Sequence, residues 1–146
     1  LKLFEECRLP AHKFSFEITE TTAIGNLVVA QEFMSCMQEI GCRFALDDFG
    51  TGMSSFGYLK SLPVDFLKID GSFVKEILHD PIDREMVRSI NEIGHLTGKQ
   101  TIAEFAETEE IVTMLRGIGV DFAQGYAIEE PKRIFEAGYS AGTRWT

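Results

Sequence analysis

The sequence predicts an α/β fold in which parallel strands are joined by helices, and three observations support this fold class. Strand-like and helix-like segments alternate five times along the chain. No Asn-Gly or Asp-Gly turn joins one strand segment directly to the next, so helical crossovers between parallel strands are implied. Each strand segment also ends on a polar residue. Because the carboxyl ends of such strands converge on the mouth of a parallel barrel, we expect one polar site there.

The expected strands are segments that alternate apolar and polar residues, or short apolar runs between turn residues. The first of them, Lys13–Glu20, alternates most clearly. Within a barrel, Phe14, Phe16 and Phe122 are expected to face the interior. In chain order, the five strands are expected over residues 13–20, 42–46, 65–70, 100–107 and 120–126.

The expected helices are segments with apolar residues at a spacing of three or four. The strongest pattern covers Pro81–Leu96, where Ile82, Val87 and Ile90 lie on one stripe. His95 near its end complements the helix dipole, with a ligand role as the alternative. The helices are expected over residues 1–9, 26–40, 54–60, 81–96, 109–118 and 132–137, with a further helix starting at Gly71. Residues 1–137 are expected to form one domain, followed by a tail over 138–146.

Composition narrows the class of protein. A chain of 146 residues with 45% hydrophobic residues is expected to form one globular unit. A net charge of -9 argues against nucleic acid polymers as partners, because they require a basic face. The three cysteines, Cys7, Cys36 and Cys42, form neither a Cys-x-x-Cys motif nor an even set, which predicts reduced thiols in a cytoplasmic protein. A membrane anchor of the parent protein, if any, would lie upstream.

The segment Phe44–Gly52 is the strongest chemical signal, because an apolar strand runs into the adjacent acids Asp47 and Asp48 and then into a glycine-rich turn. Carboxylate oxygens are the ligands that hard divalent cations prefer. Two such cations can activate a water and stabilise displacement at phosphorus. Successive side chains of a strand point to opposite faces, so both acids reach one site only where the backbone is already turning. The alternative is that Asp48 caps the next helix and Asp47 is solvated.

Four further polar residues end the other strands: Glu17, Lys68, Glu104 and Gln124. Taken singly, each residue has a simpler structural explanation. Glu17 could be an exposed acid at a strand end, and Lys68 could form an ion pair with Asp47 or Asp70. Together they favour one site, since carboxylates gathered at a barrel mouth would repel one another without cations. Lys68 could then orient the attacking water, and Gln124 could hydrogen-bond the water or a phosphate oxygen.

Five segments resemble the EAL family of cyclic di-GMP phosphodiesterases. They are FEITE at 16–20, DDFGTG at 47–52, LKID at 67–70, AEFAE at 103–107 and AQGY at 123–126. The resemblance implies hydrolysis of cyclic di-GMP to linear pGpG with two Mg or Mn ions. Residue by residue, it implies metal ligands at Glu17, Asp47, Asp48 and Glu104, with Asp47 bridging. It further implies that Lys68 and Gln124 contact the hydrolytic water, that Glu104 is catalytic as well as a metal ligand, and that Glu20 and Glu107 hold the loop over 49–56.

The resemblance also implies an incomplete barrel. The five strand–helix units correspond to strands four to eight of a TIM-type (β/α)8 barrel, which takes about 250 residues. The Glu-Ala-Leu motif and an Asn-bearing third strand are absent and are expected upstream, where a sensory or GGDEF-type domain is also conceivable. We therefore expect the 146-residue chain alone to be inactive, and to associate with itself through open barrel edges or as an EAL-type dimer. A second departure is Phe105, where the family usually has glycine.

A catalytically silent module that binds cyclic di-GMP or a partner protein is the alternative function. Every motif ligand that falls within this chain is intact, including Lys68 and all four carboxylates. A domain kept for binding alone would have no reason to keep them. The sequence therefore favours an enzyme.

Overall fold

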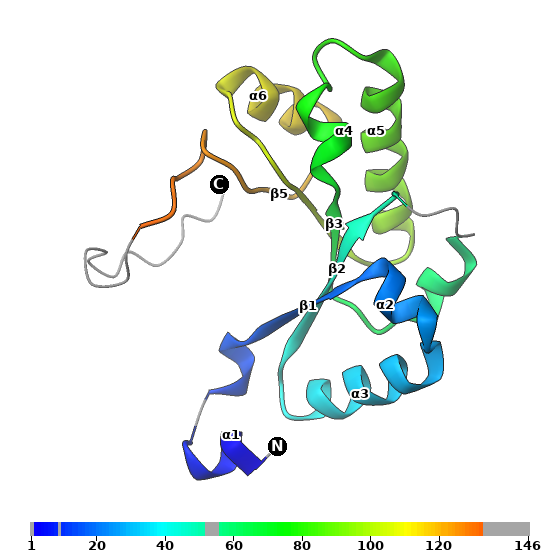
Figure 1. Ribbon diagram of the computed structural model, residues 1–146, viewed down its shortest axis with the longest axis vertical. Helices are drawn as coiled ribbons and strands as arrows, with labels where there is room; N and C mark the ends of the chain where they lie inside the picture. The colour runs from blue at the N-terminus through cyan, green and yellow to red at the C-terminus, as the bar shows by residue number, and fades with distance from the viewer. Residues whose placement is uncertain (1, 9, 52–55, 133–146) are drawn as a thin grey trace.

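The computed structural model describes residues 2–8, 10–51 and 56–132. Its centre is one sheet of five parallel strands in the order β1-β2-β3-β4-β5, which is also their order in the sequence (Figure 1). The prediction of parallel strands is confirmed. The strands are β1 (Ser15–Thr19), β2 (Arg43–Phe49), β3 (Phe66–Ile69), β4 (Gln100–Ala103) and β5 (Phe122–Ala123). Four of them are shorter than expected, whereas β2 is longer and includes both adjacent acids.

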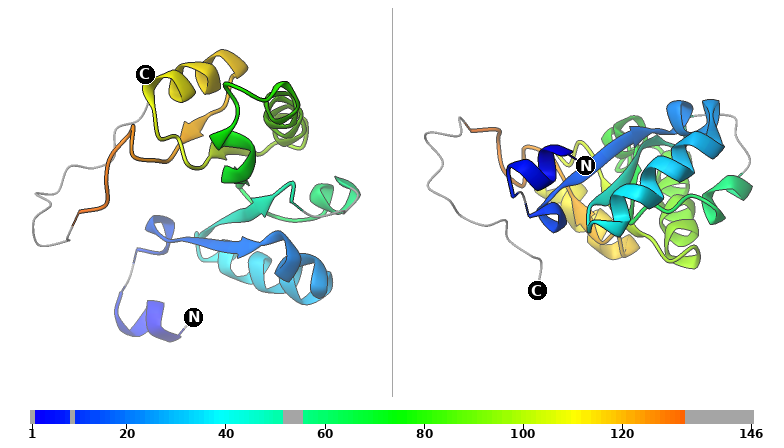
Figure 2. Two further views of the ribbon diagram at one scale, coloured as in Figure 1. Left: turned by 45° about the horizontal axis from the view of Figure 1, so that its top comes forward. Right: turned by 90° about the horizontal axis from the view of Figure 1, so that it is seen from below.

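Apart from the helix that precedes the first strand, the helices connect the strands and lie along the outside of the curved sheet (Figure 2). Their bounds are α1 (Lys2–Glu6), α2 (Glu20–Gly25), α3 (Leu27–Glu39), α4 (Gly71–Lys75), α5 (Pro81–Leu96) and α6 (Glu109–Ile118), with 3-10 turns η1 (Ala11–Lys13) and η2 (Phe56–Lys60). The bounds of α5 and α6 match the sequence prediction because both begin at strong caps, Asp80 and Thr108. Of the helix expected at 132–137 the structure describes only Lys132, which is not helical; residues 133–137 and the tail at 138–146 lie outside the described part of the chain.

Helix α2 was not expected, because its six residues are too few to show a helical period. It starts where the side chain of Thr19 accepts a hydrogen bond from the Thr22 backbone N–H, so Glu20 opens a helix rather than ending a strand. No helix in the described part of the chain is long and apolar enough to cross a membrane. A cytoplasmic location stays a prediction from the cysteines.

The core lies between the sheet and the helices. It contains four completely buried residues of β2 and β3: Phe44, Leu46, Leu67 and Ile69. The helices contribute Met34 of α3, Val87 of α5 and Leu115 of α6 to the same core. The expectation that Phe16 faces the barrel interior was wrong. Its ring stacks on Phe44 at 5.5 Å and contacts Phe33 of α3 at 6.4 Å between ring centroids, so it belongs to the outer layer.

A polar network joins α5, β4 and the start of β5 at the amino end of the sheet. Asp121 Oδ2 accepts hydrogen bonds from the Thr101 backbone N–H at 2.7 Å and its hydroxyl at 3.1 Å. His95 Nε2 lies 2.8 Å from the same oxygen, and the Thr101 hydroxyl also lies 2.5 Å from the Asn91 Oδ1. Burial raises the pKa of Asp121, but these donors outweigh it and hold the pKa below its ordinary value. The network fixes where β5 starts beside β4.

Candidate active site

A β-bulge in β2 brings the two adjacent acids to one site. Leu46 pairs with Leu67 and Phe49 pairs with Ile69, so Asp47 and Asp48 together face only Lys68 of β3. Asp48 takes the left-handed conformation, with φ 55°. A bulge of this kind re-aims a side chain that regular alternation would send to the opposite face. The backbone turn that lets both acids reach one site therefore lies within β2, at Asp48, rather than after the end of the strand.

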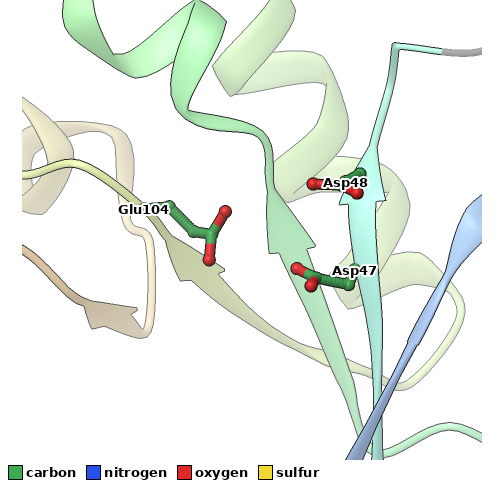
Figure 3. Close-up of side chains that lie close together, drawn as sticks. All are labelled: Asp47, Asp48 and Glu104. Carbon is green, nitrogen blue, oxygen red and sulfur yellow. The ribbon is translucent and has the colours of Figure 1, made fainter.

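Three carboxylates gather at the carboxyl ends of the strands. Asp47, Asp48 and Glu104, the residue after β4, each offer an oxygen within 4.8 Å of the other two. Figure 3 shows Asp47 and Glu104 pointing toward one another from the two sides of β3, with Asp48 nearer the end of β2. Burial raises the pKa of Asp48, and the charges of Asp47 and Asp70 raise it further. This is the electrostatic state expected where like charges are crowded.

Lys68 is the cation at the centre of this group. Its Nζ lies 2.8 Å from Glu17 Oε2, 2.8 Å from Asp47 Oδ1 and 2.7 Å from Glu104 Oε1, so it joins β1, β2 and β4. The side chain is only 5% exposed. Burial alone lowers the pKa of Lys68, but the three carboxylates outweigh burial and raise it above its ordinary value. The ammonium is therefore charged at neutral pH. A simple ion pair with one aspartate, the alternative reading of Lys68, does not account for its three carboxylate partners.

The oxygens present fit a hard divalent cation. Asp47 Oδ1 is buried, and its close partner among the described residues is the Lys68 ammonium at 2.8 Å. A carboxylate oxygen has two lone pairs, so contact with one ammonium leaves a lone pair for a metal ion. Asp47, Asp48 and Glu104 could thus hold an ion. This all-oxygen donor set suits hard divalent cations better than softer metals.

Glu17 and Gln124 occupy the margin of this group. The Glu17 carboxylate bonds Lys68 but lies outside the set of three close carboxylates, and its side chain is 53% exposed. Gln124 follows β5, where its backbone bonds Ala103 and Ala106, and its exposed side chain lines cavities with Glu17 and with Glu104. Metal binding by Glu17 and water binding by Gln124 stay predictions.

Glu20 supports the turn that follows the acidic pair. It is 5% exposed; its Oε2 accepts from the Gly50 backbone N–H at 3.3 Å, and its Oε1 accepts from the Tyr58 hydroxyl at 2.5 Å. Burial raises the pKa of Tyr58, and the bond to Glu20 raises it further. Tyr58 was not singled out from the sequence, since nothing there links it to Glu20. Residues 52–55 of this loop lie outside the described part of the chain, and Glu107 is exposed with no hydrogen bond to a described residue, so its loop role stays a prediction.

Phe105 beside Glu104 adopts the left-handed conformation, with φ 53°. This conformation costs a non-glycine residue roughly 1–2 kcal/mol, which explains why a family would favour glycine at this position. A second tight point lies opposite, where a Cβ on Gly125 would be 2.3 Å from the Ala106 carbonyl oxygen. The two chain segments that frame Glu104 and Gln124 are therefore in close backbone contact.

Fold and site together define a parallel α/β barrel protein, seen here over five strands, with an acidic metal-type site at the carboxyl ends of the strands. The sequence matches the EAL domain profile over residues 1–131. The chain belongs to the EAL domain family, as its motifs predicted. In this family context the five strands form part of a TIM-type barrel.

Named relatives and solved structures agree with this assignment. The cyclic di-GMP phosphodiesterase PdeB of Shewanella oneidensis is 47% identical over 126 residues, which are 86% of this chain and 15% of that protein. The PaMucR phosphodiesterase, solved as a c-di-GMP complex, is 31% identical with a TM-score of 0.87 over 92% of this chain and 55% of that one. The EAL domain of Mycobacterium smegmatis DcpA is 37% identical with a TM-score of 0.80 over 89% and 58%. The chain thus spans only part of each protein it matches.

Proposed function

We propose that this chain forms the carboxyl-terminal part of a metal-dependent phosphodiesterase domain that hydrolyses cyclic di-GMP to linear pGpG. The observation that carries the proposal is the arrangement around Lys68. One buried ammonium contacts the carboxylates of Glu17, Asp47 and Glu104, which lie in or directly after three different strands. Glu17 is 51 residues away from Lys68 in the sequence. A structural ion pair needs one partner, whereas a site for phosphoryl transfer needs several anionic ligands and a fixed cation.

The residues that would hold divalent ions are Asp47, Asp48 and Glu104, with Glu17 as a further ligand. Bound Mg²⁺ or Mn²⁺ ions would supply Lewis-acid activation of water and charge neutralisation at the phosphate. Asp47 would be the ligand shared by the two ions, since its Oδ1 is buried and has Lys68 Nζ, at 2.8 Å, as its close partner among the described residues. The bulge fixes the separation of Asp47 and Asp48 before any ion binds.

Lys68 would act as an electrostatic and orienting group. Because its pKa is raised, it does not serve as a base at neutral pH. A fixed ammonium can donate a hydrogen bond to the attacking oxygen and offset negative charge that develops there. Gln124 faces the same cavity as Glu104 and can donate or accept a hydrogen bond with the water or the phosphate. Glu20 holds the turn at Gly50 and so keeps the acidic pair in place.

The test is hydrolysis of cyclic di-GMP by the full-length protein with Mg²⁺ or Mn²⁺, with chromatographic detection of pGpG. Lys68→Ala should reduce kcat on the order of 100- to 1,000-fold, the usual effect of removing one such donor. The matched control is Lys60→Ala, at an exposed lysine of η2, which should leave kcat within twofold. Wild-type protein that binds the dinucleotide without producing pGpG would overturn the proposal and favour the silent binding module.

A further inference from the structure

Phe105 is a large apolar side chain left partly open beside the candidate active site. It directly follows Glu104 in the chain, and 45% of its surface is exposed. A bulky residue kept in the left-handed conformation is strained, and glycine would relieve that strain. The ring therefore sits at the edge of the site at a conformational cost.

The helix that follows β3 fixes the ring on one side. A Cβ built on Gly71 would lie 2.0 Å from Cδ2 of Phe105, so the ring fills the space that a side chain at position 71 would need. The Lys75 ammonium lies 3.9 Å from the ring centroid, within cation–π distance. Gly71 and Lys75 are four residues apart, which places them on the same face of α4. The ring therefore rests against this face of α4.

Phe105 also lines a small cavity of about 190 Å³. Phe105, Glu104 and Gln124 line it, together with Tyr126, a second aromatic residue that is 65% exposed. Sites that enclose a drug-sized ligand measure roughly 300–1,000 Å³, so this cavity suits one planar ring system rather than a whole dinucleotide.

We propose that Phe105 is a base-stacking residue that binds one purine of the cyclic dinucleotide, an assignment that rests on the proposed function. Aromatic side chains stack on bases because every base has a π face. The ammonium of Lys75 on one face draws electron density from the ring, and this favours an electron-rich purine on the other face. The cavity also places the base next to Glu104 and Gln124, where a phosphate joined to the same nucleoside would meet the acidic group.

The experiment compares wild type, Phe105→Gly, Phe105→Tyr and Gly71→Ala in the full-length protein with Mn²⁺. Two substrates are used: cyclic di-GMP, and bis(p-nitrophenyl) phosphate, a phosphodiester that contains no purine. Phe105→Gly removes the ring and relieves the left-handed strain, so the variant should fold. Its specificity ratio, kcat/KM for cyclic di-GMP over kcat/KM for bis(p-nitrophenyl) phosphate, should fall on the order of tenfold or more through a rise in KM.

The other two variants separate stacking from a general structural effect. Phe105→Tyr keeps the ring and should keep the wild-type ratio. Gly71→Ala should lower the ratio as Phe105→Gly does, because its Cβ displaces the ring, and the double variant should be no worse than Phe105→Gly alone. Leu96→Ala, at a residue of α5 that is 86% exposed, is the control and should leave kcat/KM unchanged for both substrates.

Equilibrium dialysis with labelled cyclic di-GMP separates failure of the inference from failure of the proposed function. If wild type hydrolyses the dinucleotide and Phe105→Gly keeps the wild-type ratio, the stacking role is wrong and the proposed function stands. If wild type does not hydrolyse it but binds it at least tenfold more tightly than Phe105→Gly, the stacking role stands and the enzymatic proposal fails. Absence of binding by wild type overturns both.

Discussion

Replacing Lys68 by methionine should destabilise the protein and make it dependent on divalent metal. The ammonium is 5% exposed and contacts Asp47 and Glu104, whose side chains are 21% and 16% exposed. Removing one partner from a buried ionic group costs about 3–5 kcal/mol, since the remaining charges are left unpaired. We expect about 3 kcal/mol, the lower end, because both carboxylates keep some contact with water. Glu17, at 53% exposure, should add little.

The assay is urea unfolding followed by circular dichroism at neutral pH, once with EDTA and once with Mn²⁺. The midpoint of Lys68→Met should fall in EDTA with little change in the m-value. Mn²⁺ at about 100 times its Kd should restore roughly 2.7 kcal/mol, because it replaces the lost positive charge in the folded state only. The control Lys60→Met should change stability by less than about 0.5 kcal/mol. A variant as stable as wild type in EDTA would refute the reasoning.

Three further predictions concern other parts of the site and its support. Asp121 has a lowered pKa, so its carboxylate stabilises the fold above the ordinary Asp pKa of about 3.9 and this stability is lost as pH falls through the folded pKa. Asp121→Asn should therefore flatten the acid limb of a stability–pH curve, and an unchanged limb would contradict this. Asp48→Gly should be about 1 kcal/mol more stable than Asp48→Ala in thermal unfolding, although both should lose hydrolysis; equal stabilities would argue against the left-handed bulge. Glu20→Ala should cost about 1–3 kcal/mol in urea unfolding, more than Tyr58→Phe, because it leaves two donors unpaired.

The parallel topology and the position of most site residues could be predicted from the sequence. Helices α5 and α6 carry both a helical period and capping residues, so their bounds were predictable. The strand-end residues Asp47, Lys68 and Glu104 were expected to meet because parallel strands share one edge, and the ion pairs of Lys68 show that they do.

Other features depend on contacts that leave no local pattern. The bulge at Asp48 results from pairing with β3, and a strand read alone gives strict alternation. The alternation of β1 shows that Phe16 lies on one face of the strand but not which face points to the barrel interior. Its contact with Phe33 of α3 places it in the outer layer. The pairing of Phe105 with Gly71 is likewise a tertiary relation between residues 34 positions apart, which neither residue announces in the sequence. Self-association through the sheet edges stays a prediction.

The polar network of His95, Thr101 and Asp121 differs from the Lys68 group in how much chain it closes. Its hydrogen bonds join residues 10 to 26 positions apart, whereas Lys68 and Glu17 are 51 apart. Short closures carry a smaller entropy loss than long ones. The segment from α5 to β5 should therefore act as a local cooperative unit that forms early and opens late. Metal binding needs β2 and the end of β4 to be in place together, so it would occur only once folding is complete. Amide exchange should show β1 opening while β4 remains protected.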